Sequence, residues 1–479
     1  MRLRDLIAEV QPVRVRGALD RDIARLTQDS REAGPGAVFV ALRGHHVDGH
    51  RFVPGLHAEA VVVEEAVEAA PGVTVIEVAD TRVALARMAA ALYGHPSRAL
   101  SLVGFTGTNG KTSSCWIFES IAQVAGWPVG VIGTTGNRIR GEASPARFTT
   151  PMPPEWQALL ARMRDAGCTT VAAEVSSFGL AGRRVDATRF KVAVYTNLSQ
   201  DHLDIHGTME AYAAAKARLF TELLPDDGVA VLNIDDPVVA ALPPLRAQTL
   251  RFGLDTGDLR TEGLATDLTG ARFLLKTPAG DAPVQMRLVG RHNVENALAA
   301  AGAALALGAT PAQISAGLAA LDHIPGRLER VGDGEPVVLV DYAHTDDALT
   351  TVLGTLRPLT RGRVLIVFGC GGDRDRAKRP IMARAATEGA DVVLATSDNP
   401  RSEDPLAILE DMRPGLGPDA ILEPDRARAI HRAVRLARPG DVVLIAGKGH
   451  ETTQEIAGEK LPFDDREVAL AALRGDPCA

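Results

Sequence analysis

Short apolar runs alternate with stretches of helical spacing along most of this chain. Runs of strand length lie at residues 37–41, 60–63, 102–105, 170–174, 192–196, 337–340, 364–367, 392–394 and 442–445. Stretches of helical character lie at residues 82–92, 113–124 and about 293–321. Alternation of this kind is typical of parallel sheets joined by crossover helices. We therefore expect an α/β protein whose central and C-terminal parts are doubly wound.

Two punctuated breaks divide this pattern into three parts. Gly94-His-Pro-Ser97 ends the first part and Ile324-Pro-Gly326 ends the second. A chain of 479 residues is long enough for about three domains, each with a core of its own. We expect a small N-terminal α/β domain over residues 1–93, a central domain over residues 94–325 and a C-terminal domain over residues 326–479.

Composition narrows the class of protein. Apolar residues make up 46% and charged residues 23% of the chain, and no apolar run is long enough to span a membrane. Charges at Arg2, Arg4 and Asp5 argue against a signal peptide, and the four cysteines lack metal-ligand spacing, so we expect a cytoplasmic protein. A net charge of -8 and few aromatic residues disfavour nucleic-acid binding. We expect small-molecule substrates. The sequence leaves the oligomeric state open, a monomer included.

The segment Gly107-Thr-Asn-Gly-Lys-Thr112 lies between a predicted strand and a predicted helix. Small residues there let backbone N–H groups approach a polyphosphate, Lys111 supplies positive charge, and the Thr112 hydroxyl can hold a divalent cation. Phe105 stands where the common phosphate-loop pattern has a glycine, so the motif is a variant. A glycine-rich turn could be only a tight connection, but the Gly-Lys-Thr ending favours ATP or GTP binding. The predicted phosphate contacts are Gly107, Thr108, Asn109, Gly110, Lys111 and Thr112.

Polar residues also follow the ends of the next predicted strands. Ligands of doubly wound sheets gather beyond the carboxyl ends of the strands. Glu174 and His202 come at such ends and could hold Mg²⁺ together with Thr112. Considered without the other motifs, Asp201 and His202 are better explained as turn residues before Thr208, a predicted helix N-cap, than as metal ligands.

Lys216 interrupts an apolar helix face. Tyr212, Lys216 and Phe220 recur at a spacing of four residues, which places the lysine in the apolar stripe. Lysine rarely faces a core without a partner. One interpretation is that the aliphatic part of the side chain lies along the surface and its ammonium group reaches water. The other hypothesis is that the lysine has a functional role.

Three polar loops follow strands of the C-terminal part. They are Gly369–Arg374, Ser397–Arg401 and Gly447–Glu451. Arginine forks bind carboxylates, and Asp398 and Glu451 could hold an ammonium group, so this edge suits a zwitterionic amino acid. Helix caps and surface ion pairs would explain any one loop, but less easily all three.

These motifs together resemble the Mur ligase family, and within it the members that add diaminopimelate. The resemblance covers essentially the whole chain. Further segments that carry it lie at residues 29–31, 149–151, 174–177, 197–207, 214–216, 292–296, 325–329 and 341–344. It implies an N-terminal domain that binds a uridine nucleotide, a central P-loop parallel-sheet ATPase domain and a C-terminal Rossmann-like domain that binds an amino acid.

The resemblance also implies which residues contact each substrate. UDP-MurNAc-L-Ala-D-Glu would contact Ser30, Thr149, Thr150, Ser176 and Arg184. ATP would contact the phosphate loop and also Asn296, Arg327 and Asp341. The amino acid would be meso-diaminopimelate, and its contacts would be Arg374, Asp398, Asn399, Pro400, Arg401, Gly447 and Glu451.

The same resemblance implies two Mg²⁺ ions and a modified lysine. Lys216 matches the lysine that such ligases carbamylate with CO₂, and the carbamate would position one magnesium ion. Glu174 and His202 would hold a second ion, so the expected metal ligands are Thr112, Glu174, His202 and carbamylated Lys216. The expected catalytic residues are Lys111, Lys216, Glu174 and His202. They would act in a reaction that passes through an acyl phosphate.

Three positions depart from the family pattern, and other functions stay open. Phe178 stands where histidine is frequent, Gly182 where a polar residue is common, and Asp346 where proline is usual. A lysine-adding relative is the alternative within the family, and folylpolyglutamate synthase fits less well because it lacks a uridine-binding domain. The alternative from another class is a nucleotide-dependent switch or scaffold.

Overall fold

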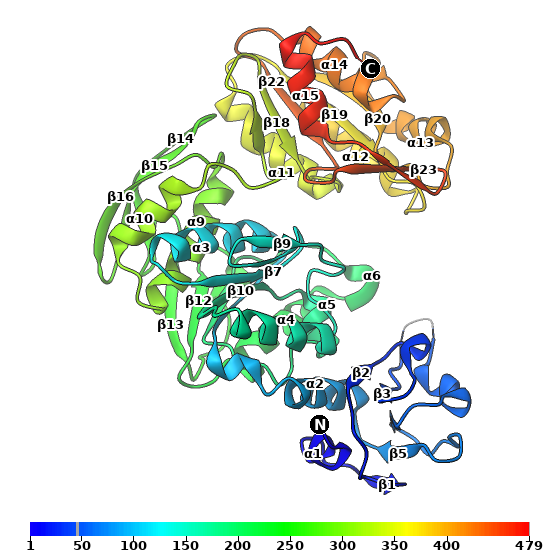
Figure 1. Cartoon of the computed structure of the whole chain (residues 1–479). Helices are drawn as coiled ribbons and strands as arrows, with labels where there is room; N and C mark the ends of the chain where they lie inside the picture. The colour runs from blue at the N-terminus through cyan, green and yellow to red at the C-terminus, as the bar shows by residue number, and fades with distance from the viewer. Residues whose placement is uncertain (45–46, 479) are drawn as a thin grey trace. The chain divides into compact units, whose positions relative to one another are not determined.

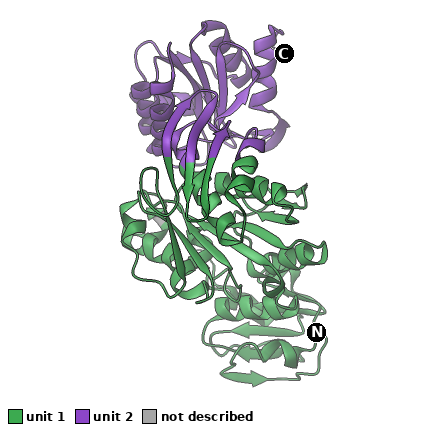
Figure 2. Ribbon diagram, turned by 90° about the vertical axis from the view of Figure 1, so that its left-hand side faces the viewer, with its two compact units in different colours: residues 1–261, 275–282, 295–317 green, residues 262–274, 283–294, 318–479 purple. Residues whose placement is uncertain are grey.

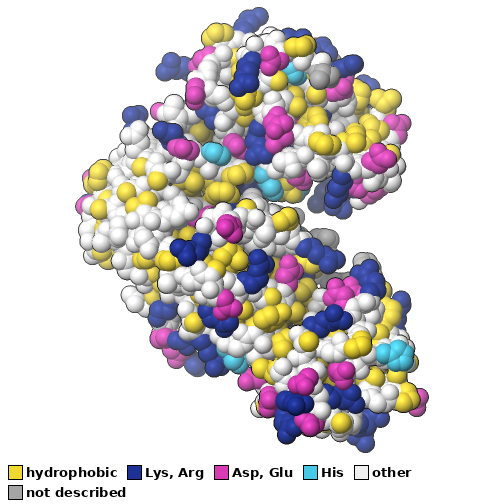
Figure 3. Space-filling model, in the orientation of Figure 1, with side chains coloured by type: hydrophobic (Ala, Val, Ile, Leu, Met, Phe, Trp, Pro, Cys, Tyr) yellow, Lys and Arg dark blue, Asp and Glu magenta, His cyan; other side chains and the backbone are white. Residues whose placement is uncertain are grey.

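The computed structural model describes residues 1–44 and 47–478 (Figure 1). The chain divides into two compact units. The first consists of Met1–Thr261, Leu275–Ala282 and Glu295–Gly317, and the second of Glu262–Leu274, Pro283–Val294 and the chain from Leu318 onward (Figure 2). Within the described ranges, no helix has the length and apolar character needed to cross a bilayer. On the face drawn in Figure 3, Lys and Arg side chains are interspersed with Asp and Glu side chains.

The N-terminal part of the first unit is built on one small sheet. Its strands in spatial order are β1 (Arg14–Arg16), β5 (Thr74–Glu77), β4 (Ala60–Val63), β3 (Ala37–Val40) and β2 (Arg25–Thr27). Strand β1 is antiparallel to β5, and the other pairs are parallel. Helices α1 (Leu3–Ile7) and α2 (Thr81–Leu92) bury apolar side chains against one face of this sheet. The Asp80 side chain caps α2 by accepting hydrogen bonds from the Arg82 and Val83 amides.

The central sheet of the first unit carries the predicted phosphate loop. Its strands in spatial order are β13 (Gln248–Phe252), β12 (Val229–Asn233), β11 (Val192–Tyr195), β6 (Ser101–Thr106), β10 (Thr170–Glu174), β7 (Val129–Ile132), β8 (Asn137–Ile139) and β9 (Glu142–Ser144). The strands from β13 to β7 are parallel, and β8 and β9 form an antiparallel extension. Glu174 pairs with Phe105, and Tyr195 pairs with Thr106. The carboxyl ends of β10, β6 and β11 therefore lie level with one another.

Helices cover both faces of the central sheet. Phe118 of α3 (Lys111–Val124) packs edge-on against Phe105 of β6, with ring centroids 6.0 Å apart. Side chains of α4 (Pro153–Asp165) share a buried cluster with Leu102 on the opposite face of β6. Further helices of this part are α5 (Ser177–Ala181), α6 (Leu203–His206), α7 (Met209–Arg218) and α8 (Pro237–Ala240), and α9 and α10 are described below.

The second unit is built on a doubly wound sheet. Its strands in spatial order are β17 (Glu329–Val331), β18 (Val337–Asp341), β22 (Val442–Ala446), β19 (Val364–Cys370), β20 (Val392–Ser397) and β21 (Ile421–Leu422). All neighbouring pairs are parallel except β17 with β18. Two buried clusters lie on opposite faces, because successive side chains of each strand alternate. One cluster includes α11 (Asp346–Leu356), α12 (Lys378–Gly389) and α13 (Pro405–Met412), and the other includes α14 (Arg426–Leu436) and α15 (Asp465–Arg474).

The strands and helices expected from apolar periodicity are confirmed, with one correction. The stretch predicted as helical over residues 293–321 is two helices, α9 (Arg291–Ala306) and α10 (Pro311–Ala320). Gly308 adopts a φ of 95°, which is left-handed and ends the first helix, and Pro311 begins the second.

The sequence patterns did not predict the antiparallel strands. Besides β1 and β17, these are β14 (Arg260–Asp267), β15 (Gly270–Thr277) and β16 (Gly280–Met286), together with β8, β9 and the hairpin of β23 (Thr453–Ile456) and β24 (Glu459–Pro462). Strands β14 and β15 mix buried, partly buried and exposed positions, and β24 is exposed throughout, so these strands contain few continuous apolar runs.

Candidate active site

The predicted phosphate loop joins β6 to α3. Gly110 is the N-cap of α3 with a φ of 88°, and Gly107 has a φ of 153°. A Cβ atom at Gly107 would overlap the Thr196 hydroxyl, and one at Gly110 would overlap the side-chain oxygen of Asn296. Only glycine fits both positions, and the first N–H groups of α3 have no acceptor within the helix itself, the usual arrangement for binding phosphate.

The end of β11 braces this loop from the side. The Thr196 hydroxyl donates a hydrogen bond to the Asn109 carbonyl at 2.6 Å, and the Asn197 side-chain oxygen accepts one from the Asn109 amide at 2.9 Å. The Lys111 Nζ atom donates to the Gly107 and Thr108 carbonyls, both at 2.8 Å. The predicted phosphate-binding residues therefore form one braced loop with the lysine ammonium folded against it.

Glu174 lies at the end of β10, beside Thr112. Its carboxylate accepts hydrogen bonds from the hydroxyls of Thr112 and Thr134, both at 3.0 Å, and from the Thr134 amide at 2.8 Å. These donors are neutral, and Glu174 is only 1% exposed. Buried carboxylates are commonly paired with a cation or coordinate a metal ion. The oxygens of Glu174 and Thr112 therefore fit a divalent cation beside the phosphate loop.

Lys216 of α7 is buried against the same loop. It is 1% exposed, and its Nζ atom donates a hydrogen bond to the Gly107 carbonyl at 2.7 Å. The same atom lies 4.5 Å from the centre of the Tyr212 ring. Burial, and secondly the Lys111 ammonium, lowers the pKa of Lys216 well below its usual value, while Asp201 opposes that change. The alternative in which the side chain reaches water is wrong, because the amine is enclosed.

His202 lies directly before α6 and is the N-cap residue of that short helix. Its backbone is left-handed, with a φ of 55°, and its side chain is 42% exposed with Nε2 3.5 Å from an Asp201 carboxylate oxygen. The Phe178 ring packs 5.0 Å from the His202 ring. The predicted N-cap is confirmed, because the Thr208 hydroxyl accepts a hydrogen bond from the Ala211 amide. His202 is thus a turn residue with an accessible imidazole, and its role as a metal ligand stays a prediction.

Four of the predicted substrate contacts form a cluster next to Glu174. The Thr149 hydroxyl lies 2.9 Å from that of Thr134, and the Arg184 guanidinium donates to the Thr150 carbonyl at 2.9 Å. The Thr150 hydroxyl donates to Ser176 Oγ at 3.1 Å and accepts from the Ser176 amide at 3.0 Å. Because Thr150 is 1% exposed, its hydroxyl supports the loop, whereas Thr149, Ser176 and Arg184 keep partly exposed surfaces.

Ser30 lies in a separate place, in the N-terminal part. It begins the short helix Ser30–Glu32, which the Asp29 side chain caps by accepting a hydrogen bond from the Arg31 amide. Ser30 is partly exposed. Its contact with the uridine nucleotide stays a prediction.

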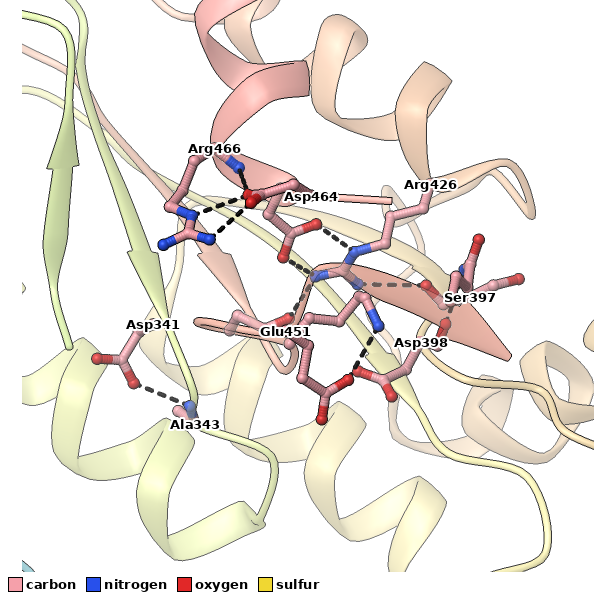
Figure 4. A network of polar contacts seen from close by, with 12 residues as sticks. Asp341, Ala343, Ser397, Asp398, Arg426, Glu451, Asp464 and Arg466 are labelled. Atoms are coloured by element: carbon pink, nitrogen blue, oxygen red, sulfur yellow. Dashed lines mark hydrogen bonds and ion pairs between the residues drawn. The ribbon is translucent and has the colours of Figure 1, made fainter. Parts of the chain in front are cut away.

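The remaining predicted nucleotide contacts fall in different units. Asn296 lies in the first unit, against Gly110. Arg327 and Asp341 lie in the second unit, where the Asp341 carboxylate accepts hydrogen bonds from the Leu328 and Ala343 amides at 2.8 Å (Figure 4). Burial raises the pKa of Asp341, and the nearby Arg327 guanidinium opposes this.

The three polar loops of the second unit meet at one edge of its sheet. The Asn399 amide group donates to Glu451 Oε2 at 2.9 Å, and the Arg401 guanidinium donates to the Gly372 carbonyl at 2.6 Å. A Cβ atom at Gly372 would overlap the Pro400 carbonyl, so these loops pack closely. Arg374 at the end of the first loop is exposed.

Asp398 and Gly447 lie side by side within this edge. A Cβ atom at Gly447 would stand 2.6 Å from Asp398 Oδ2, so the carboxylate approaches the backbone only because residue 447 is glycine. Burial raises the pKa of Asp398, while Arg426 and then Lys448 lower it. The Asp398 carboxylate, placed at a strand end, can accept hydrogen bonds from an ammonium ligand.

Several residues of the site were missed from the sequence. Thr134 follows β7, so the strand-end rule would have found it. Lys448, whose side chain is fully buried, donates from Nζ to Asn399 Oδ1 at 3.1 Å and to Glu451 Oε2 at 3.0 Å. Lys448 lies inside the third loop, but only Gly447 and Glu451 of that loop were predicted to contact the amino acid. No pattern near Arg426 in the sequence indicates that this residue belongs to the site.

Comparison with known proteins accounts for this arrangement. The profile described as Mur ligase family, catalytic domain, matches residues 22–93, that of the Mur ligase middle domain matches residues 105–304, and that of the Mur ligase, glutamate ligase domain, matches residues 326–449. The chain is 44% identical to a UDP-N-acetylmuramoyl-L-alanyl-D-glutamate--2,6-diaminopimelate ligase of Geobacter sulfurreducens, with 99% of each chain covered. It is 46% identical to the ligase of the same name from Gloeobacter violaceus, over 99% of this chain and 98% of the other.

A solved structure agrees with these sequence relatives. A ligase structure of that name is 36% identical and has a TM-score of 0.70, with 99% of both chains covered. Sequence identity above 40% over the full length, three matching profiles and a shared fold lead to one conclusion. The chain belongs to the Mur ligase family.

Proposed function

We propose that the protein is an ATP-dependent ligase that adds meso-2,6-diaminopimelate to UDP-MurNAc-L-Ala-D-Glu in cytoplasmic peptidoglycan precursor synthesis. The observation that carries this proposal is the junction of three loops at one sheet edge, where Asn399, Glu451, Arg401 and Gly372 are joined by hydrogen bonds. That edge offers carboxylates for an ammonium and a guanidinium for a carboxylate. The names of the full-length relatives support the same substrates.

Each part of the chain has a task in this proposal. Residues 1–93 bind the uridine nucleotide through Ser30, residues 94–325 bind ATP and the dipeptide, and residues 326–479 bind the amino acid. A carboxylate oxygen of the D-glutamate residue attacks the γ-phosphorus of ATP, and the bond from that phosphorus to the ADP oxygen breaks. The amine of diaminopimelate then attacks the acyl carbon, phosphate leaves, and the amine nitrogen loses its proton.

The residues around the phosphate loop stabilise charge in the first step. The N-terminus of α3 and the Lys111 ammonium contact the phosphates, so their positive charge matches the charge that develops during phosphoryl transfer. Thr112 and Glu174 would supply adjacent oxygen ligands for Mg²⁺, and Glu174 with His202 would hold a second ion. Bound Mg²⁺ supplies electrostatic stabilisation of the transferring phosphoryl group. Catalysis by this chain is therefore mainly positioning and electrostatic.

Lys216 takes part as a carbamate. Its lowered pKa, caused mainly by burial, favours the neutral amine, which is the form that attacks CO₂. A nitrogen–carbon bond forms, one proton leaves, and the product is an anion buried beside the Gly107 carbonyl. An anion at that place supplies a further oxygen ligand for magnesium.

Phosphate release tests the substrate assignment. ATP, UDP-MurNAc-L-Ala-D-Glu and either meso-diaminopimelate or L-lysine are supplied to wild type, Arg401→Ala and a control, Arg413→Ala. Arg413 lies on the surface of the same unit and pairs only with Glu410 among the described residues. Losing a charged hydrogen bond costs about 1.5–3 kcal/mol, or roughly 10- to 150-fold in kcat/KM for diaminopimelate.

The outcomes separate three functions. Turnover with diaminopimelate alone, lost in Arg401→Ala and kept in Arg413→Ala, supports the proposal. Equal turnover with lysine would identify a lysine-adding enzyme. ATP hydrolysis that neither amine stimulates would instead favour a nucleotide-dependent switch.

A further inference from the structure

Arg426 and Asp465 form a completely buried ion pair behind the amino-acid edge. Both side chains are 0% exposed. The Arg426 Nε and Nη2 atoms donate to the two carboxylate oxygens of Asp465, each at 2.7 Å. The arrangement is a bidentate fork, which fixes both side chains in orientation.

The same guanidinium also binds the ends of two strands. Arg426 Nη1 donates to the Ser397 carbonyl at 3.2 Å, and Nη2 donates to the Ala446 carbonyl at 3.0 Å (Figure 4). Ser397 ends β20 and Ala446 ends β22, and β19 lies between these strands in the sheet. One side chain therefore ties together two strand ends that do not hydrogen-bond to each other directly. The next residues along the chain are Asp398 and Gly447.

The location of Arg426 on its helix runs against helix electrostatics. Arg426 is the first residue of α14, and the N-terminus of a helix carries partial positive charge that disfavours a cation. Asp465, the first residue of α15, occupies a favourable position for an anion. The charge of Arg426 thus lies at an unfavourable position. All the described hydrogen bonds of its side chain go to Asp465 and to the two strand ends, which indicates a role at those strand ends.

Asp398 is the charged group that this role concerns. The ionisable side chains that act on it or are acted on by it are Arg426, Lys448, Glu451, Cys370 and Tyr342, and Asp465 stands behind Arg426. Burial raises the pKa of Asp398, and Arg426 is the strongest influence in the opposite direction. A Cβ atom at Gly447 would lie 4.0 Å from Arg426 Nη2 and 2.6 Å from Asp398 Oδ2. Glycine at 447 therefore leaves no side chain between the guanidinium and the carboxylate.

We propose that the Arg426–Asp465 pair positions the amino-acid site, by holding the backbones before Asp398 and Gly447 and by placing the guanidinium next to the Asp398 carboxylate, which can accept an ammonium group. Arg426 is a positioning residue, since it acts through Asp398. Asp465 allows the guanidinium to be buried and fixes its direction. This inference rests on the proposed function for the identity of the ammonium ligand, but not for the effect of Arg426 on Asp398.

Three variants test the proposal. Arg426→Met/Asp465→Leu removes both charges and retains apolar volume, a replacement that buried ion pairs often tolerate. Arg426→Lys keeps the charge but loses the fork to Asp465. Arg138→Met/Glu119→Leu is the matched control, because that ion pair is also buried, with side chains 7% and 6% exposed, its Arg138 Nε atom donates to both Glu119 carboxylate oxygens, and it lies in the first unit.

Steady-state kinetics give the first readout. In Arg426→Met/Asp465→Leu the KM for meso-diaminopimelate should rise about tenfold, because the Ser397 and Ala446 carbonyls lose the donor that holds both strand ends. The KM values for ATP and UDP-MurNAc-L-Ala-D-Glu should stay unchanged. The acid limb of kcat/KM for the amino acid should move to higher pH, because Asp398 without Arg426 is protonated more easily. Arg426→Lys should raise the amino-acid KM and leave the acid limb in place.

A second readout does not depend on turnover. Carboxyl ¹³C NMR, with the Asp398 signal identified through Asp398→Asn, follows the titration of Asp398 in each protein. Its pKa should be higher in Arg426→Met/Asp465→Leu than in wild type or the control. If wild type lacks amine-dependent turnover, the proposed function fails, and the NMR titration still decides the positioning role.

Two results would overturn the inference. One is a folded Arg426→Met/Asp465→Leu protein with the wild-type amino-acid KM and the wild-type Asp398 titration, which would make the pair purely structural. If that variant does not fold, Arg426→Lys decides, and a wild-type amino-acid KM in Arg426→Lys overturns the positioning claim.

Discussion

Replacing Lys216 with methionine should change how stability depends on pH. The wild-type amine is 1% exposed and has a pKa well below its usual value, mainly because of burial. Methionine has a similar length and an apolar end, so the enclosed space stays filled. The Gly107 carbonyl keeps a donor, because the Lys111 Nζ atom also donates to it at 2.8 Å. The substitution itself should therefore cost no more than about 1 kcal/mol.

The sign of the pH effect follows from proton linkage. Between the low pKa in the folded protein and the ordinary lysine value of about 10.4, the unfolded chain binds a proton that the folded chain does not. Stability of the wild type should therefore rise with pH across that window. One proton corresponds to about 1.4 kcal/mol per pH unit at most. Lys216→Met lacks this contribution, so its stability relative to wild type should fall as pH rises.

Urea unfolding at a series of pH values, in buffers freed of CO₂, measures this difference. Subtracting the two free energies of unfolding removes the groups that both proteins share. A difference that does not change with pH would refute a neutral, buried amine. In the same pair, bicarbonate should stimulate ligation by wild type and leave Lys216→Met at a residual rate, about 10²–10³-fold lower.

Three further predictions concern other parts of the site. Gly110→Ala should raise the KM for ATP, because its Cβ would overlap a neighbouring asparagine, whereas Gly126→Ala has a similar positive φ and open space and should cost only about 1–2 kcal/mol of stability without changing that KM. Glu174→Gln should lower kcat by about 10²-fold and raise the Mg²⁺ concentration needed for half-maximal rate, and an unchanged Mg²⁺ titration would contradict its role as a ligand. Arg426→Met alone should lower the free energy of unfolding by about 3–5 kcal/mol because Asp465 is left buried and unpaired, and Asp465→Leu added to it should recover most of that loss in urea unfolding. If Arg426→Met unfolds at the same free energy as the wild type, the fork contributes nothing to stability.

Local patterns predicted much of this fold and part of the site. Apolar runs such as Val364–Val367 fall inside strands, because a strand buried on both faces needs no polar alternation. The spacing of Tyr212, Lys216 and Phe220 predicted a buried lysine, and all three residues are buried. The cap at Thr208 was predicted from residue type alone. These features depend on neighbours close in sequence.

Features that depend on distant neighbours could not be predicted in the same way. Asp465 lies 39 residues beyond Arg426, and nothing near either residue indicates that they pair. Alanine-rich spacing concealed the end of α9 at Gly308, because alanine continues a helical pattern on both sides of the break. The chemical roles of His202 and Ser30 stay predictions, since their positions alone do not select a ligand.

The level strand ends of the central sheet determine which insertions this chain tolerates. Glu174 pairs with Phe105 and Tyr195 pairs with Thr106, so hydrogen-bond register sets the separation between Glu174 and the phosphate loop. One residue inserted within β10 would turn Glu174 to the opposite face of the sheet. Insertions in an exposed loop, such as the turn at Gly141, would leave that register intact. Divergence among relatives should therefore accumulate length changes in loops while the number of residues in β6, β10 and β11 stays constant.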